Sequence, residues 1–107
     1  MSWDELCRRR RAIDAVLAHA ERFPSADLPL DLPAVREAFD SRADLLMALQ
    51  SDWSQALWAQ IDLISYTTNS RLLNAVDVCR AAWMETARRR PTLRRLLDAC
   101  QDDVSVA

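Results

Sequence analysis

Residues 44–66, DLLMALQSDWSQALWAQIDLISY, form the most apolar stretch of the chain. Apolar side chains recur in it at steps of three or four residues, which is the spacing of one face of an α-helix. The stripe contains Leu46, Leu49, Trp53, Leu57, Ile61 and Ile64, with Leu45, Ala56 and Leu63 on one border and Met47 and Trp58 on the other. Ser41 is placed to cap this helix. We therefore expect one long central helix around which the remaining segments pack.

The segment before the central helix predicts two more helices. Ser2 and Glu5 have the capping-box spacing, so a first helix should begin there and end near Phe23, ahead of a proline. Residues 24–32 contain Pro24 and Pro29, which indicates a loop. This loop is too short to separate two domains. A short helix is then expected to begin near Pro33.

The segment after the central helix also predicts helices. Asn69 can cap the next one, which should stop at Pro91. Its expected inward stripe is Leu72, Val76, Cys79, Trp83 and Ala87. A last short helix carries Leu93, Leu96 and Leu97, and residues 101–107 are expected to fray. No segment alternates like a β-strand. The predicted fold is all-α, a compact bundle of four to five helices in a single domain of residues 1–100.

The composition excludes several classes of enzyme. The chain has 107 residues, enough for one core, and contains no glycine. Phosphate-cradling loops and the sharp turn of the nucleophile elbow need glycine, so ATPase, dinucleotide-binding and α/β-hydrolase folds are not expected. The only histidine, His19, is predicted on a surface face without a nucleophile beside it. Asp44 and Asp62 lie about five helical turns apart and cannot act as a carboxylate pair. We predict no catalytic residue and no cofactor.

The three cysteines do not indicate a metal site. Cys7, Cys79 and Cys100 are far apart and form no CxxC pair, so neither zinc nor a disulfide framework is expected. Cys79 falls in an apolar stripe and is predicted to be a core residue. No leader sequence is evident. No uncharged apolar span is long enough to cross a membrane, because Asp52 and Asp62 interrupt the most apolar segment. The expectation is a cytoplasmic protein with reduced thiols and no membrane contact.

Four tryptophans are many for a small helical bundle. Trp3 and Trp58 lie off the apolar stripes and, with Met47, are the predicted interface residues. Trp53 and Trp83 lie within stripes and are most simply core residues. Together with the polar residues at the end of the central helix they could also line a ligand pocket, whose candidates are then Trp53, Asp62, Tyr66 and Trp83. A plain turn after the helix would have the same polar composition.

Charge is unevenly distributed along the chain. Residues 24–68 carry seven acidic residues against two arginines, and residues 69–97 carry seven arginines against two acidic residues. The candidates for contacting nucleic acid are Arg88, Arg89, Arg90, Arg94 and Arg95, although a net charge of −2 does not favour that function. In the run of residues 8–11, Arg10 falls near the apolar stripe, and Asp14 is its expected partner one turn away.

Three segments together resemble TetR-type transcriptional regulators. They are AIDAVLAHAERF (12–23), AFDSRADLLMAL (38–49) and DVCRAAWMETARRRPTLRRLL (77–97), about 45 residues in the order of the first helix, the start of the fourth helix and a ligand-domain helix of that family. The resemblance implies a regulator that keeps a helical core. The family's helix-turn-helix would have to fit between Phe23 and Phe39, and that interval is too short, acidic and rich in proline, so the resemblance does not imply sequence-specific DNA binding.

The prediction for function is a small, non-enzymatic interaction or regulatory protein that acts through homo- or hetero-association of helical faces. A homodimer is the expected form, because the central helix is apolar on more than one side and a second chain could cover it. The alternative is a TetR-like transcription regulator that binds a small ligand or nucleic acid.

Overall fold

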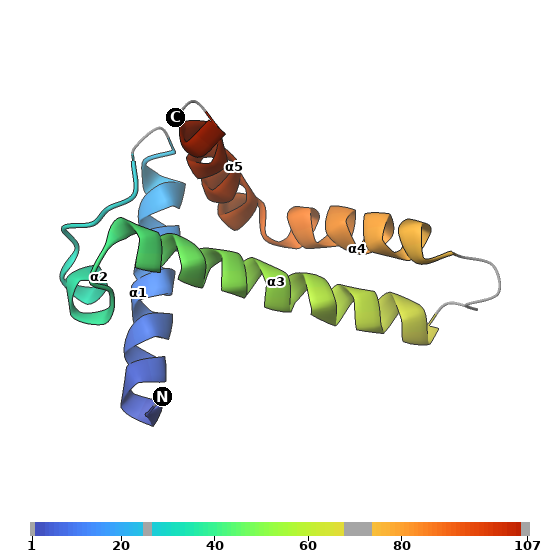
Figure 1. Ribbon diagram of the computed structural model, residues 1–107, viewed down its shortest axis with the longest axis horizontal. Coiled ribbons are helices and arrows are strands. Elements are labelled where there is room, and N and C mark those ends of the chain that lie inside the picture. Colours follow the sequence, from blue (N-terminus) through green and yellow to red (C-terminus); the bar gives the residue numbers. More distant parts are fainter. Residues whose placement is uncertain (1, 25–26, 68–73, 106–107) are drawn as a thin grey trace.

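The computed structural model describes residues 2–24, 27–67 and 74–105, and these residues form helices without any strand (Figure 1). The five helices are α1 (Trp3–Arg22), α2 (Pro33–Ala38), α3 (Arg42–Thr67), α4 (Ala75–Arg89) and α5 (Pro91–Ser105). The predicted all-α fold around a long central helix is confirmed, with α3 as that helix.

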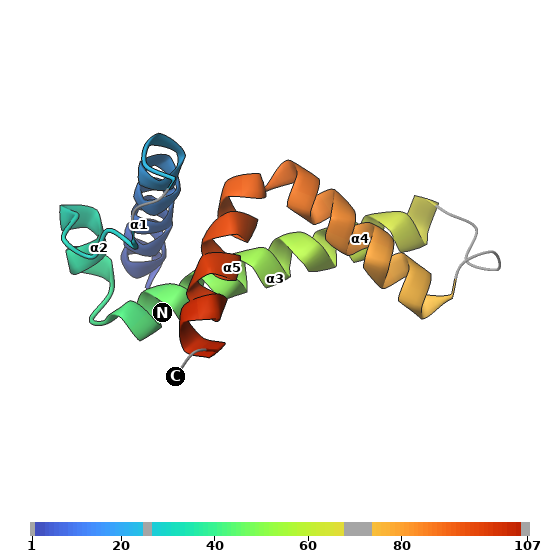
Figure 2. The same cartoon turned by 90° about the horizontal axis from the view of Figure 1, so that it is seen from above.

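The helices are distributed unequally along α3. In Figure 1 and in the view from above in Figure 2, α1, α2 and α5 gather around the N-terminal half of α3. The C-terminal half of α3 extends away from this group, and α4 returns across it towards α5. The fold therefore has a layered part at one end and a two-helix hairpin at the other.

The helix starts follow the local sequence. The Ser2 hydroxyl accepts a hydrogen bond from the Glu5 amide at 3.2 Å, and the Ser41 hydroxyl accepts one from the Asp44 amide at 3.1 Å, so both predicted N-caps are confirmed. For α4 the cap is Asn74, whose side chain accepts from the Asp77 amide at 2.9 Å. The sequence had indicated Asn69, which lies outside the described residues.

The end of the last helix differs from the prediction. The sequence predicted a frayed segment over residues 101–107, but α5 continues to Ser105. No glycine or proline follows Pro91, so nothing in the sequence interrupts the backbone hydrogen bonds of this helix.

The core lies where α1, α2 and α5 meet the first half of α3. Leu45 and Leu49 of α3 have no exposed surface, and Val16 of α1 and Leu93 of α5 are buried against the same cluster. The other buried members are Ala12, Ile13, Ala20, Leu28, Val35, Phe39, Trp53, Leu96, Leu97 and Cys100. The half of the predicted α3 stripe that precedes Trp53 is therefore a true core face.

The second half of the stripe is not buried. Leu57, Ile61 and Ile64 are only partly covered, and Leu63 is 49% exposed. In α4 the buried side chains are Ala82 and Thr86, which are small enough to let the two helices approach closely.

The predicted inward stripe of α4 is therefore wrong at Val76 and Cys79, whereas Ala87, its last member, packs against the core. Val76 is 65% exposed, Trp83 is 43% exposed, and Cys79 is exposed rather than a core residue. Helical periodicity places these three side chains on one flank of α4, but the buried residues Ala82 and Thr86 lie on the neighbouring flank, and of the three only Trp83 makes a ring contact with α3, through Trp53. Leu72 belongs to the same predicted stripe and lies outside the described residues.

The dimensions reflect this projecting hairpin. The radius of gyration is 15.8 Å, against about 13 Å for a typical domain of this length. The accessible surface is 7588 Å², whereas a folded monomer of 12.2 kDa exposes about 6,100 Å². The chain thus exposes about 1,500 Å² more than a compact monomer of its mass. No described helix has the length and apolarity needed to cross a membrane.

Candidate interaction surface

A charged contact holds α1, α3 and the α4–α5 junction together. Asp52 lies in α3 with only 9% of its side chain exposed. Its two carboxylate oxygens accept hydrogen bonds from Arg10 Nη1 at 3.0 Å and from Arg90 Nη2 at 2.8 Å. Arg10 also pairs with Asp14 at 2.8 Å, as the sequence predicted. We refer to Arg10, Asp52 and Arg90 as the arginine clamp.

The clamp changes the acidity of Asp52. Burial raises the pKa of this carboxyl, but the hydrogen bonds from Arg90 and Arg10 lower it by more in sum, so the pKa lies below its ordinary value of 3.8. Asp52 is therefore ionised in the folded protein at neutral pH. The sequence signal for this site was a single carboxylate between Leu49 and Trp53 of the apolar stripe, which requires a partner when buried.

A recess lies in the angle between α1 and α3, beside the clamp. Its volume is about 560 Å³, and it is lined from α1 by Leu6, Arg9, Arg10 and Ile13 and from α3 by Asp44, Met47, Ala48, Ser51, Asp52 and Gln55. Leu6 and Met47 are 47% and 70% exposed. The lining is therefore mixed, with four apolar side chains beside six polar or charged ones, of which Arg10 and Asp52 are paired in the clamp.

One of the three predicted interface residues lines this recess. Met47 is part of its lining. Trp3 lies one helical turn before Leu6, and Trp58 lies one turn after Gln55, so each continues a wall along its own helix. Trp3 is 76% exposed and Trp58 is 62% exposed. Both tryptophans are exposed as predicted, but neither is among the residues that line the recess.

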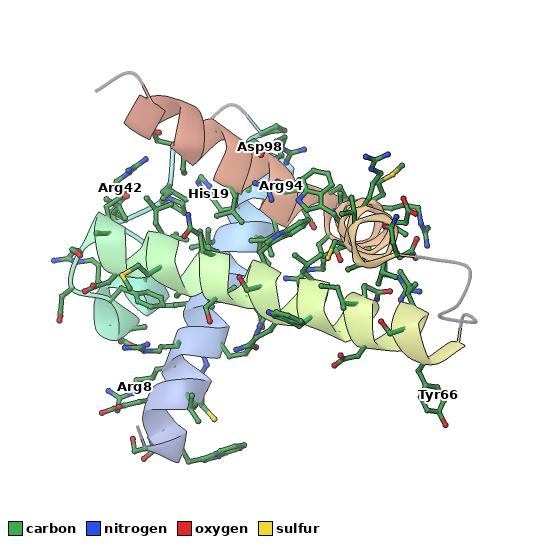
Figure 3. The ribbon with its side chains drawn as sticks, turned by 45° about the vertical axis from the view of Figure 1, so that its right-hand side comes forward. Arg8, His19, Arg42, Tyr66, Arg94 and Asp98 are labelled. Carbon is green, nitrogen blue, oxygen red and sulfur yellow. The ribbon has the colours of Figure 1, made fainter. Side chains whose placement is uncertain are left out.

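The four predicted ligand-pocket residues do not converge. Trp53 and Trp83 are in edge-to-face contact with ring centroids 5.7 Å apart. Asp62 is exposed and Tyr66 is 92% exposed. Along the helix these two lie about 14 Å and 20 Å from Trp53. Figure 3 shows Tyr66 at the far end of α3, pointing away from the other helices.

An arginine occupies the space beside the tryptophan pair. The Arg94 guanidinium lies 4.5 Å from the Trp53 ring centroid and 5.4 Å from that of Trp83, and it pairs with Asp98 at 2.7 Å. Figure 3 shows Arg94 and Asp98 together on α5, next to α4. The pair of rings and the cation form a packed contact between α3, α4 and α5. The apolar periodicity predicted that Trp53 is buried, but it did not predict that the guanidinium of Arg94 lies against its ring.

Each of the five predicted nucleic-acid arginines has a partner within the chain. Arg88 and Arg89 pair with Glu85 at 2.6 Å and 2.8 Å, and Arg90 belongs to the clamp. Arg95 donates to the carbonyl oxygen of Ala20 at 3.1 Å, which caps the end of α1. With Arg94 held by Asp98 and the tryptophans, each of the five has a contact within the chain, although Arg88 and Arg89 are 70% and 55% exposed and share the carboxylate of Glu85.

The Glu85 ion pairs give a spectroscopic prediction. Hydrogen bonds from Arg88 and Arg89 lower the pKa of Glu85 from 4.5 to about 2. We expect the side-chain carboxyl ¹³C shift of Glu85 to titrate with a midpoint near pH 2 at low salt. Arg88→Gln should move the midpoint up towards 4.5, because the largest contribution comes from Arg88. A wild-type midpoint near 4.5 would contradict the pairing, and Met47→Ala serves as a remote control.

No metal-binding group was found. Among the residues that the structure describes, no three His, Cys, Asp or Glu side chains lie close enough to hold a metal ion. The His19 ring stacks near Phe23, with centroids 5.0 Å apart.

Comparison of the chain with protein-family models, with curated proteins and with solved structures gave no match. The resemblance to TetR-type regulators therefore stays a prediction, and the argument for function rests on the surface just described.

Proposed function

We propose that this chain is a small, non-enzymatic interaction protein that acts by association of its helical faces. The observation that carries the proposal is the recess between α1 and α3, whose lining includes the exposed apolar side chains of Leu6 and Met47. Exposed apolar side chains scattered singly are ordinary on protein surfaces, whereas a group of large ones around a concave site is typical of a contact surface.

The chemistry of the recess fits a helix of another polypeptide chain. Tryptophan and methionine are enriched at the centre of protein interfaces, because tryptophan buries a large rigid area and the flexible thioether of methionine adapts to the partner's surface. Ile13 and Ala48 form an apolar floor, and the buried Asp52 at its side is neutralised by the arginine clamp. A docking helix would therefore not leave the charge of Asp52 uncompensated.

The regulator alternative has weaker support. A ligand-binding regulator would need the predicted pocket residues to face a common cavity, but Tyr66 and Asp62 lie along the exposed end of α3. A DNA-binding regulator would need arginines directed towards phosphates, and those five arginines bond to groups of the same chain. Association of helical faces requires neither arrangement.

Truncation of Trp58 tests the proposal. We expect Trp58→Ala to weaken association about tenfold or more, since a buried interface tryptophan is worth about 2 kcal/mol. His19→Ala should leave association unchanged, because His19 contacts Phe23 at the far side of α1. The measurement is native mass spectrometry of protein purified gently from its own cells. Equal effects of the two substitutions would contradict the role of Trp58, and a bare 12.2 kDa species at all concentrations would overturn the proposal.

A further inference from the structure

A second hollow lies between α3 and α4, and we call it the α3–α4 pocket. Its volume is about 480 Å³, within the range of about 300–1,000 Å³ that sites for small molecules occupy. It shares no residue with the recess between α1 and α3, and it contains none of the four predicted ligand-pocket residues. The lining residues are Ala56, Ala59 and Gln60 of α3, Thr86 and Arg89 of α4, and Arg90, the C-cap of α4.

Short side chains leave this space open. Ala56 and Ala59 end in a methyl group, so at these two positions α3 has no side chain long enough to fill the space beside α4. Thr86 is 1% exposed, and its hydroxyl donates to the carbonyl oxygen of Ala82 at 2.7 Å. The hydroxyl hydrogen of Thr86 is therefore used within α4. The lining offers apolar methyl groups from α3 and hydrogen-bond donors from one amide and two guanidinium groups.

The charged groups of the lining are all positive. Two of the six lining residues are arginines, and none is acidic. Three other hollows on the described part of the chain differ in this respect, because at least one carboxylate lines each of them: Asp40 between α2 and α3, Asp44 and Asp52 between α1 and α3, and Glu5 and Glu37 between α1 and α2. An anion in the α3–α4 pocket would therefore meet donors without a carboxylate in the lining to repel it.

The two arginines keep donors for a ligand. Arg89 bonds to Glu85 through Nε at 2.8 Å, and Arg88 bonds to the same carboxylate. Arg90 bonds to Asp52 through Nη2 at 2.8 Å, within the arginine clamp. A guanidinium carries five N–H groups, so these bonds leave donors on both side chains for another acceptor. The Arg89 and Arg90 side chains are 55% and 30% exposed, so a dissolved ligand can reach them.

We propose that the α3–α4 pocket binds a small carboxylic acid in its ionised form, with the carboxylate at Arg89 and Arg90 and an apolar body against Ala56 and Ala59. A planar carboxylate matches the fork of a guanidinium. A short hydrocarbon or aromatic body would cover the alanines, which a purely polar anion would leave unused. The inference goes beyond the proposed function and does not depend on it, because this pocket lies apart from the recess.

Titration with simple probes tests the pocket. Benzoate and hexanoate have a carboxylate and an apolar body, benzyl alcohol lacks the charge, and inorganic phosphate lacks the apolar body. We expect at least one of the two acids, at millimolar concentration, to shift the backbone amide signals of Ala56, Ala59 and Gln60 saturably in ¹H–¹⁵N spectra. Benzyl alcohol and phosphate should each bind at least about tenfold more weakly, since each lacks one of the two interactions.

Arg89→Gln and Arg88→Gln form a matched pair of variants. Both arginines bond to Glu85 and are exposed, at 55% and 70%, but only Arg89 lines the pocket. For the acid that binds more tightly, Arg89→Gln should raise the dissociation constant at least about tenfold, and Arg88→Gln should change it less than about threefold.

Ala59→Leu tests the apolar side of the pocket. Leucine is a good helix former and Ala59 is exposed, so the fold should be preserved while the larger side chain fills the space. The saturable shifts should then be lost.

Each of the contrary results would overturn the inference. They are the absence of saturable binding of either acid, binding of benzyl alcohol or phosphate as tight as that of the acids, equal losses in Arg88→Gln and Arg89→Gln, and binding that survives Ala59→Leu. All of them leave the proposed function standing, because association is measured without any added acid. A protein that binds the acid but stays at 12.2 kDa without a partner would have the opposite meaning, since it would overturn the proposed function alone.

Discussion

Asp52→Asn is expected to lower the free energy of unfolding by about 2–3 kcal/mol. The substitution keeps the shape of the side chain but removes the charge that Arg10 and Arg90 share. Loss of one partner of a fully buried ion pair costs about 3–5 kcal/mol. The expected value is smaller because the two arginines keep 50% and 30% of their side-chain surface exposed and can regain water.

The effect should depend on pH in a defined direction. Because the pKa of Asp52 is lowered by folding, its contribution to stability is complete above the ordinary carboxyl pKa of 3.8 and is lost as the pH falls through the lower, folded-state value. Urea unfolding of wild type and Asp52→Asn should therefore differ by a constant amount at pH 6–8. The difference should shrink as the pH falls below about 4.

Asp62→Asn is the control for the clamp, because Asp62 lies on the same helix and is exposed. It should change stability by less than about 0.5 kcal/mol. A double-mutant cycle between Asp52→Asn and Arg90→Gln should show a coupling energy of about 1 kcal/mol or more. Additive effects of the two substitutions would mean that the clamp does not contribute as a unit.

Leu49→Ala is expected to destabilise the fold by about 2–5 kcal/mol. Leu49 has no exposed surface and lies in the core cluster, so its truncation loses buried apolar area and leaves a cavity between α3 and the helices that cover it. Met47→Ala provides the comparison two residues away on the same helix, and it should cost less than about 0.5 kcal/mol because Met47 is 70% exposed. Urea denaturation of both variants measures the difference, and similar losses would contradict the assignment of the core face.

Those features of the fold that depend on neighbouring residues could be predicted from the sequence. The caps at Ser2 and Ser41 and the exposure of Met47 and Trp58 follow from spacing along a single helix. The pairing of Arg10 with Asp14 likewise needs only one turn of helix.

Features that join distant segments could not be predicted in this way. Asp52 meets Arg10 and Arg90, which are 42 and 38 residues away, and no local pattern selects those two among 14 basic residues. The side of α4 that faces α3 was mispredicted for a related reason. Periodicity fixes which residues share a flank, but the choice of flank depends on how closely the neighbouring helix can approach, and this favoured Ala82 and Thr86.

The contact between Arg95 and the carbonyl of Ala20 has a consequence for how the chain is made. It joins residues that are 75 positions apart, and α5 also supplies Leu93, Leu96 and Leu97 to the core around α1. During synthesis, α1 leaves the ribosome long before the segment that covers it. The nascent chain must therefore carry α1 and the first half of α3 with uncovered apolar faces until α5 has been synthesised. Folding of the layered part therefore waits for the synthesis of α5, and any truncation ahead of α5 would leave a polypeptide prone to aggregation and degradation.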